Sequence, residues 1–125
     1  MHTYEGLVRG AFDLLENDDL EGYVDCLTDD VLETNPIGVF RGKAEVLAYN
    51  HQTLRETLAA HFRRVEHLVV SGESVAVWLT FGGTVAATGR SFEVEGCVIF
   101  DIRDGKVCAV TEYVDFTEAQ AAFVA

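Results

Sequence analysis

Residues 88–116 read TGRSFEVEGCVIFDIRDGKVCAVTEYVDF, and two long alternating patterns meet within them at Asp104-Gly105. Such a dipeptide favours a tight hairpin, because glycine accepts a positive φ without steric cost. In the return strand Glu112 shares a face with Val110 and Val114, since side chains alternate between the two faces of a strand. We therefore expect a curved antiparallel sheet whose apolar face carries a carboxylate and forms the floor of a ligand pocket. The apolar face of the first strand consists of Phe92, Val94, Gly96, Val98, Phe100 and Ile102.

The alternating period of this hairpin continues upstream to about residue 62. It predicts strands over residues 62–70 and 74–81, with a turn at residues 71–73 between them. Gly82-Gly83 falls inside the strand pattern and predicts a bulge or a bend. The C-terminal half of the chain is thus expected to be a set of antiparallel strands.

The N-terminal half follows the helical period instead. Residues 4–15 carry an apolar stripe and predict an amphipathic helix, with Thr3 as its N-cap. Asp18 and Glu21 resemble the capping box of a short second helix, and residues 44–58 predict a third helix.

Two short segments complete the expected fold. Residues 31–35 predict a strand that ends at Pro36 and a turn, and Thr117 with Gln120 predicts the cap of a final helical turn. The order of helices first and strands afterwards predicts a single α+β domain over residues 1–125. In it, about three N-terminal helices pack on one face of a curved, mixed but mostly antiparallel sheet and enclose a pocket.

Composition excludes several classes of partner. The chain has 125 residues, of which 49% are hydrophobic and 24% charged, enough for one compact core. A net charge of −12 argues against nucleic acid and anionic membranes, and no apolar run approaches the roughly 20 residues that span a bilayer. The opening residues do not resemble a secretory signal. The odd number of cysteines, with no C-x-x-C spacing, favours reduced thiols and a cytoplasmic location.

The order and spacing of several short motifs are similar to those of a known family. On these motifs the chain resembles the SnoaL-like branch of the nuclear-transport-factor-2-like, or cystatin-like, superfamily. The resemblance implies a cone-shaped α+β fold and a homodimer formed through the outer face of the sheet. The motifs are Asn17-Asp18-Asp19-Leu20, Leu27-Thr28-Asp29-Asp30-Val31, Phe40-Arg41-Gly42-Lys43, Val75-Ala76-Val77-Trp78-Leu79-Thr80-Phe81 and Asp104-Gly105-Lys106-Val107.

Two enzyme branches of this superfamily can be compared residue by residue. Where ketosteroid isomerases place a basic aspartate, an oxyanion-binding tyrosine and a protonated aspartate, this chain has Asn35, Ala11 and Val98. An amide does not abstract a proton from carbon at a useful rate. The three vacant roles argue against that activity.

Limonene-epoxide hydrolases resemble the chain from Thr88 to Ala121. Their second catalytic carboxylate matches Glu112 and their water-holding asparagine matches Asn35. Their water-holding tyrosine matches Glu33, however, and their arginine and first aspartate match the apolar Leu79 and Phe81. The resemblance therefore supports a pocket acid and argues against epoxide hydrolysis.

Glu112 is the main candidate for a catalytic group. A carboxylate among apolar neighbours has a raised pKa through desolvation, which makes it a general acid or base near neutral pH. The structural alternative is a hydrogen bond to a backbone amide or an ion pair with an arginine such as Arg9. Glu33 shares a strand face with Asn35 and is the second catalytic candidate, unless it lies solvated at the rim. Asn35 either orients a ligand or water, or forms the turn before Pro36.

The expected cavity is mostly apolar, although each of its residues is equally suited to plain core packing. The outer face of the sheet is half-apolar, which suggests a partner and, with the family resemblance, a homodimer. The expected ligand-binding residues are Asn35, Phe12, Tyr23, Tyr49, Leu79, Phe81, Val98 and Phe100. The expected dimer residues are Trp78, Cys97, Ile99 and Tyr113.

Motifs for metals, nucleotides and serine nucleophiles do not occur in the sequence, so we expect no metal and no cofactor. Two functions remain open. The first is an enzyme that performs acid/base chemistry on a small hydrophobic molecule with Glu112, assisted by Glu33 or Asn35; isomerisation, cyclisation, dehydration and hydration all fit. The second is a non-catalytic dimeric domain that binds a small hydrophobic ligand. A cavity that contains Glu112 favours the first, and a cavity filled by Leu79 and Phe81 favours the second.

Overall fold

The computed structural model describes residues 3–124 and confirms an α+β fold with a six-stranded sheet. The strand order is β2-β1-β6-β5-β4-β3. The elements, in chain order, are α1 (Tyr4–Glu16), α2 (Leu20–Asp25), β1 (Leu27–Asn35), β2 (Gly38–Arg41), α3 (Gly42–His51), the π-helical turn η1 (Gln52–Thr57), β3 (Leu58–Ser71), β4 (Ser74–Val85), β5 (Ser91–Arg103), β6 (Lys106–Val114) and the 3₁₀-helix η2 (Thr117–Phe123).

The predicted hairpin is confirmed and lies at the centre of the sheet. Asp104 and Gly105 both have positive φ, 54° and 76°, and they join β5 to β6. All neighbouring strands are antiparallel except β1 and β6, which run parallel, so the sheet is mixed as expected. The parallel pair brings the first strand of the chain alongside the last.

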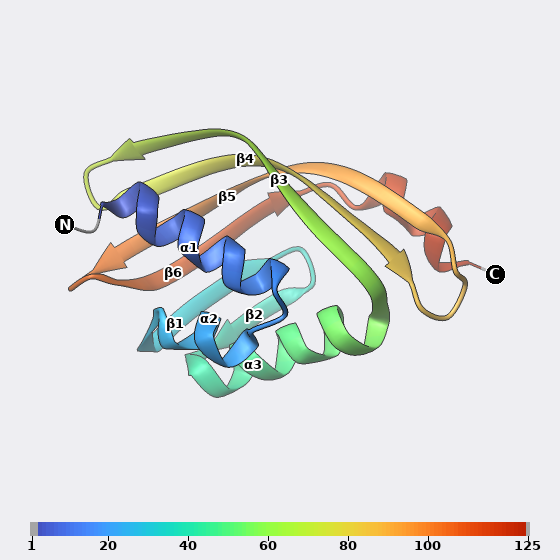
Figure 1. Ribbon diagram of the computed structural model, residues 1–125, viewed down its shortest axis with the longest axis horizontal. Helices are drawn as coiled ribbons and strands as arrows, with labels where there is room; N and C mark the ends of the chain where they lie inside the picture. The colour runs from blue at the N-terminus through green and yellow to red at the C-terminus, as the bar shows by residue number, and fades with distance from the viewer. Residues whose placement is uncertain (1–2, 125) are drawn as a thin grey trace.

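The three helices lie together on one side of the bent sheet, and η2 lies at the end opposite the N-terminus (Figure 1). The apolar stripe of α1 is buried against the sheet, where the Phe12 ring meets the edge of Phe100 at 5.4 Å between centroids. The Thr3 side chain caps α1 as predicted, by accepting from the Gly6 N–H. No helix in residues 3–124 is long and apolar enough to cross a membrane.

The cap of α2 differs from the prediction. Asp19, and not Asp18, accepts from the Gly22 N–H, because Asp18 adopts a positive φ of 59° in the turn that reverses the chain after α1. The start of η2 differs as well: its N-cap is Phe116, which caps with no side chain, and Thr117 instead donates its backbone N–H to Asp115 Oδ1.

The strands β1, β3 and β4 are longer than predicted, and β2 was not predicted. The first strand begins at Leu27 and not at residue 31, and β2 forms where only a turn was expected. Gly82 and Gly83 introduce no bulge: the pairing of β4 with β5 runs through them without a shift. The irregularities lie instead in β3. Gly82 is required because the Phe62 ring occupies the space of a Cβ.

Candidate functional site

A cavity of ≈540 Å³ lies between the inner face of the sheet and the helices. Side chains from α1, α2, α3, η1, η2 and all six strands line it, so it is enclosed by nearly the whole fold. Its volume is within the range of pockets that hold drug-sized molecules. A smaller hollow of ≈300 Å³ lies near Gly83 and Ser91 and contains no buried carboxylate.

Glu33 and Glu112 both line this cavity. Strand register places them there: Glu33 on β1 pairs with Val110, and Glu112 lies two residues further along β6, opposite Val98. Glu33 is 2% exposed, and its Oε2 accepts from the Asn35 Nδ2 at 3.2 Å. Glu112 is partly buried, and no hydrogen bond or ion pair joins its carboxylate to another described residue. The two acids therefore share one apolar compartment.

The two carboxyl groups have raised pKa values. Desolvation, followed by the neighbouring charge of Glu112, raises the pKa of Glu33 to about 8, against the opposing effects of Asn35 and Arg63. Desolvation also raises the pKa of Glu112, while Arg63 opposes the rise. Because the charge of one acid raises the pKa of the other, one can hold a proton while the other is ionised near neutral pH.

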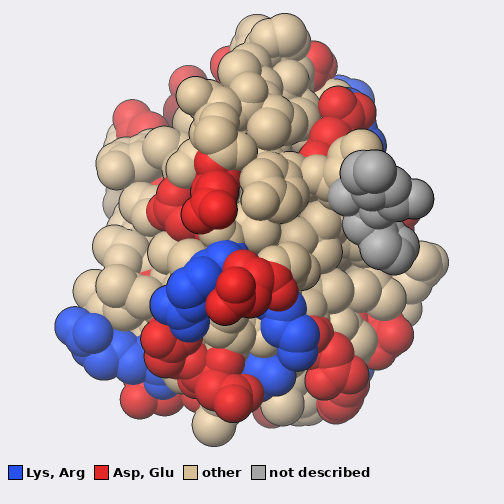
Figure 2. All heavy atoms as spheres, turned by 90° about the vertical axis from the view of Figure 1, so that its left-hand side faces the viewer, with Lys and Arg blue, Asp and Glu red and all other residues tan. Residues whose placement is uncertain are grey.

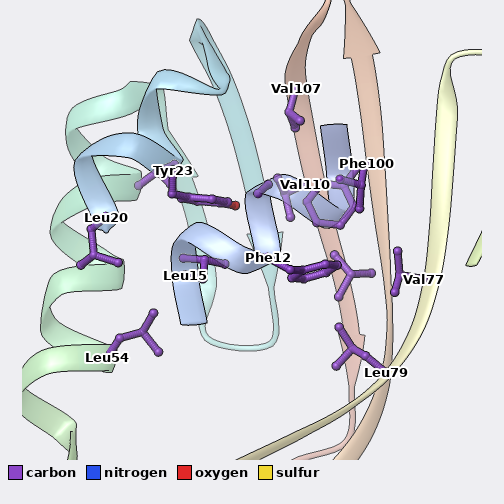
Figure 3. Close-up of a cluster of buried hydrophobic side chains, with 14 of the residues drawn as sticks. Phe12, Leu15, Leu20, Tyr23, Leu54, Val77, Leu79, Phe100, Val107 and Val110 are labelled. Carbon is purple, nitrogen blue, oxygen red and sulfur yellow. The ribbon is translucent and has the colours of Figure 1, made fainter. Parts of the chain in front are cut away.

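Two tyrosines complete the polar part of the cavity. Burial, with the charges of Glu33 and Glu112, raises the pKa of Tyr23 well above its ordinary value. The Tyr23 hydroxyl oxygen points away from α2 and toward the side of Val110 (Figure 3). Burial also raises the pKa of Tyr49, whose ring stacks on Phe40 with 4.2 Å between centroids. Both phenols therefore remain neutral hydrogen-bond donors near the acid pair.

Asn35 has the second of the two roles that the sequence left open, that of forming the turn before Pro36. Its Oδ1 accepts from the backbone N–H groups of Ile37 and Gly38 and shapes the turn between β1 and β2, while its Nδ2 donates to Glu33. It holds Glu33 in place and is not itself part of the cavity wall.

The other predicted ligand-binding residues all line the cavity, and Leu79 and Phe81 form part of its wall without filling it. These residues are Phe12, Tyr23, Tyr49, Leu79, Phe81, Val98 and Phe100. The predicted outer-face residues also lie together, since Cys97 pairs with Trp78 on one side and with Tyr113 on the other. Trp78 and Tyr113 are 50% and 63% exposed.

Sequence reasoning missed Arg63, which lines the cavity from the edge strand β3. Its guanidinium forms an ion pair with Glu16 at 3.2 Å and lies 5.0 Å from the centroid of the Phe81 ring. The suggestion that Arg9 partners Glu112 is wrong, because Arg9 pairs with Glu5 on the exposed face of α1. The alternating pattern of β3 could have identified Arg63 as a cavity residue, because it puts Arg63 in register with Phe81.

The cavity wall also contains parts of η1 and η2 that were not predicted. Gln52, Thr53 and Thr57 come from η1, and Gln120 and Phe123 come from η2. A π-helical turn is often found at functional sites, because the extra residue redirects side chains. Among residues 3–124, no three His, Cys, Asp or Glu side chains are grouped closely enough to hold a metal ion.

Comparison with known proteins agrees with this architecture. Residues 8–110 match the family model described as a SnoaL-like domain. No curated protein matches the chain.

Several solved structures have a similar fold. An NTF2-like protein of unknown function from Burkholderia pseudomallei K96243 is 22% identical, with a TM-score of 0.90 and 100% of both chains covered. A putative polyketide cyclase from Xanthomonas campestris pv. campestris is 21% identical, with a TM-score of 0.81 and 96% of each chain covered. A hypothetical protein with a ketosteroid isomerase-like fold from Catenulispora acidiphila DSM 44928, in complex with trimethylamine, is 13% identical, with a TM-score of 0.87 and 96% and 93% covered. At these identities the similarity shows the fold alone.

Proposed function

This chain belongs to the SnoaL-like domain family, and we propose that it is a cofactor-independent enzyme that performs acid/base chemistry on a small hydrophobic metabolite. The observation that carries the proposal is the pair of Glu33 and Glu112 on the wall of one largely apolar cavity. Strongly perturbed carboxyl groups in a cleft are more frequent at functional sites than elsewhere.

In the proposed mechanism Glu112 is the general base. Its carboxylate has no partner among the described residues and faces the cavity, so it is the group that reaches a substrate proton. Glu33 lies deeper and keeps a proton up to about pH 8, so it acts as the hydrogen-bond donor or general acid. In an isomerisation or a cyclisation, the proton that Glu112 takes from carbon returns to another atom of the product. In a dehydration the leaving hydroxyl takes the proton of Glu33 and departs as water, and the proton gained by Glu112 then restores Glu33.

Names of proteins with similar folds support this class of function. One is called a putative polyketide cyclase, and another holds trimethylamine. The three cysteines of the present chain are free, in keeping with the reducing cytosol where we place the protein.

Deuterium exchange tests the proposal without knowledge of the natural substrate. Apolar cyclic ketones are incubated with the protein in D₂O, and proton NMR follows the loss of hydrogen next to the carbonyl. We expect the native protein to catalyse exchange for at least one ketone and Glu112→Gln to be slower by about 10²- to 10⁴-fold, the usual contribution of a general base. Glu73→Gln, an exposed change of equal charge in the β3–β4 turn, is the control.

The alternative function is a non-catalytic domain that binds a hydrophobic ligand. It is favoured by the apolar Leu79 and Phe81, which occupy positions where limonene-epoxide hydrolases have an arginine and an aspartate. Exchange rates that are identical in the native protein and Glu112→Gln, together with measurable ligand binding, would establish this alternative.

A further inference from the structure

The acid pair has oxygens that no described residue satisfies. Glu33 Oε2 holds Asn35, whereas its Oε1 accepts no hydrogen bond, and neither oxygen of Glu112 has a partner. Unlike the buried Thr28 Oγ1, which is the one unpartnered side-chain nitrogen or oxygen within residues 3–124 that water cannot reach, these glutamate oxygens are accessible. The free oxygens of the pair therefore open into the cavity, where a bound molecule meets them.

The charge balance of the wall favours a cation. The wall carries two carboxyl groups and one cationic side chain, Arg63. That arginine is paired with Glu16 at 3.2 Å, so it offsets the charge of the acid pair only in part. A carboxylate or phosphate ligand would meet two acids and no free cation, and burial without a counter-ion is costly for such groups.

The rings around the pair suit the same kind of ligand. Phe40 and Tyr49 are stacked with 4.2 Å between ring centroids, and Phe12 and Tyr23 line the same cavity. The faces of aromatic rings attract ammonium groups, most strongly where water is excluded. The net charge of −12 also raises the local concentration of cations around the molecule.

We propose that the cavity binds an organic amine: a small molecule with an apolar body whose protonated nitrogen contacts Glu33 and Glu112. This inference rests on the proposed function and names its substrate class. The groups facing the ammonium are Tyr23 from α2, Tyr49 from α3 and Arg63 from β3, together with the two acids. An ammonium beside the pair lowers the pKa of both carboxyl groups and expels the proton that Glu33 holds in the empty cavity. Glu33 then serves as the counter-ion and Glu112 stays the base, so with an amine substrate the ammonium takes over the hydrogen-bond donor role that Glu33 has in the empty cavity.

Titration calorimetry with three probes of one shape tests this inference. The probes are phenethylamine, phenethyl alcohol and phenylacetate, which share a body and differ in the charge of the head group. Near neutral pH we expect phenethylamine to bind at least tenfold more tightly than the other two. We also expect proton release, seen as a binding enthalpy that differs between phosphate and Tris buffers.

Variants of the two glutamates test whether the acid pair is responsible for the binding of phenethylamine. Glu33→Gln and Glu112→Gln should each weaken phenethylamine binding at least tenfold, whereas Glu73→Gln should leave it unchanged. Glutamine at position 33 can still accept from Asn35, so the turn is preserved. If a variant does not fold, the selectivity and proton release of the native protein still decide.

Any of three results would overturn the inference. The first is that the alcohol or phenylacetate binds as tightly as phenethylamine or more tightly, and the second is that no probe binds. The third is that folded Glu33→Gln and Glu112→Gln bind phenethylamine as tightly as the native protein. Deuterium exchange into ketones combined with such a result would leave the proposed enzyme standing and remove only the amine.

Discussion

At the scale of single residues, the decisive feature is that two glutamates face inward. Side chains alternate along a strand, so a slip of one residue in β1 or β6 would move Glu33 or Glu112 to the opposite face. The apolar neighbours Val98 and Val110 fix that register, because they are buried in the same rows. The acids are thus held inside by the hydrophobic pattern around them, at a cost in folding stability that depends on pH.

The pH dependence of stability follows from the raised pKa of Glu33. In the folded protein Glu33 keeps its proton up to about pH 8, whereas in the unfolded chain it loses it near the ordinary glutamate value. The unfolded state binds fewer protons between these two values, so the free energy of unfolding falls as pH rises across that window. We expect Glu33→Gln to lose less stability than the native protein between about pH 5 and about pH 8, by up to a few kcal/mol.

Urea unfolding across a pH series measures this difference. Glu73→Gln removes one exposed charge and therefore controls for the general repulsion within an acidic protein. A slope that is the same in Glu33→Gln and in the native protein would show that Glu33 is ionised in the folded state.

At the scale of elements, the alternating strands and the amphipathic α1 were predictable because each carries one simple period. The turn after β1 was predicted from Asn35 and Pro36, but the strand β2 was not, because its four residues are too few to show an alternating period. Glu112 was found from its apolar neighbours. Arg63 was missed because its significance depends on the pairing of an edge strand with β4.

The helix η2 packs against the sheet of its own chain. It folds back over its own sheet, where Ala119 and Ala122 are buried and Phe123 packs near Phe92 with 6.0 Å between ring centroids. Since Gln120 and Phe123 line the cavity, η2 forms part of its wall. One side-chain hydrogen bond, from Thr88 Oγ1 to the Ala122 carbonyl at 2.5 Å, joins it to the β4–β5 turn.

Removal of that bond should loosen η2. A neutral hydrogen bond contributes about 1 kcal/mol, so Thr88→Val should speed amide hydrogen exchange in η2 by roughly fivefold and leave α1 unchanged. Thr84→Val is the matched control, because the Thr84 hydroxyl bonds only to Ser91, away from η2. Unaltered exchange in η2 would show that its buried alanines alone hold it in place.

At the scale of the whole molecule, the two faces of the sheet differ. The inner face is covered by helices and encloses the cavity, whereas Trp78 and Tyr113 on the outer face remain exposed. Charged side chains do not follow this division between the two faces: at the end of the molecule near the N-terminus, acidic and basic side chains are intermingled (Figure 2). Ion pairs such as that of Arg103 with Asp30 account for part of this mixture.

We propose that a second copy of the chain covers the outer face. Trp78, Cys97 and Tyr113 form a continuous row across three strands, and such a row can meet its own copy across a two-fold axis. A stable dimer buries about 800 Å² on each partner, more than these residues supply alone, so Ile99 and the neighbouring strand residues must take part.

Sedimentation equilibrium at micromolar concentration tests this assembly. We expect the native protein to have twice the mass of the chain and Trp78→Glu to be a folded monomer, because a carboxylate at the centre of the interface would lose its hydration without gaining a counter-ion. Ile37→Glu is the matched control, since Ile37 is 68% exposed at the turn between β1 and β2 and not on the outer face. A native monomer, or a dimer that persists in Trp78→Glu, would mean that the aromatic row has another role. If Ile37→Glu also dissociates the dimer, the interface includes the cavity wall that Ile37 lines, and the acid pair then lies close to the partner chain.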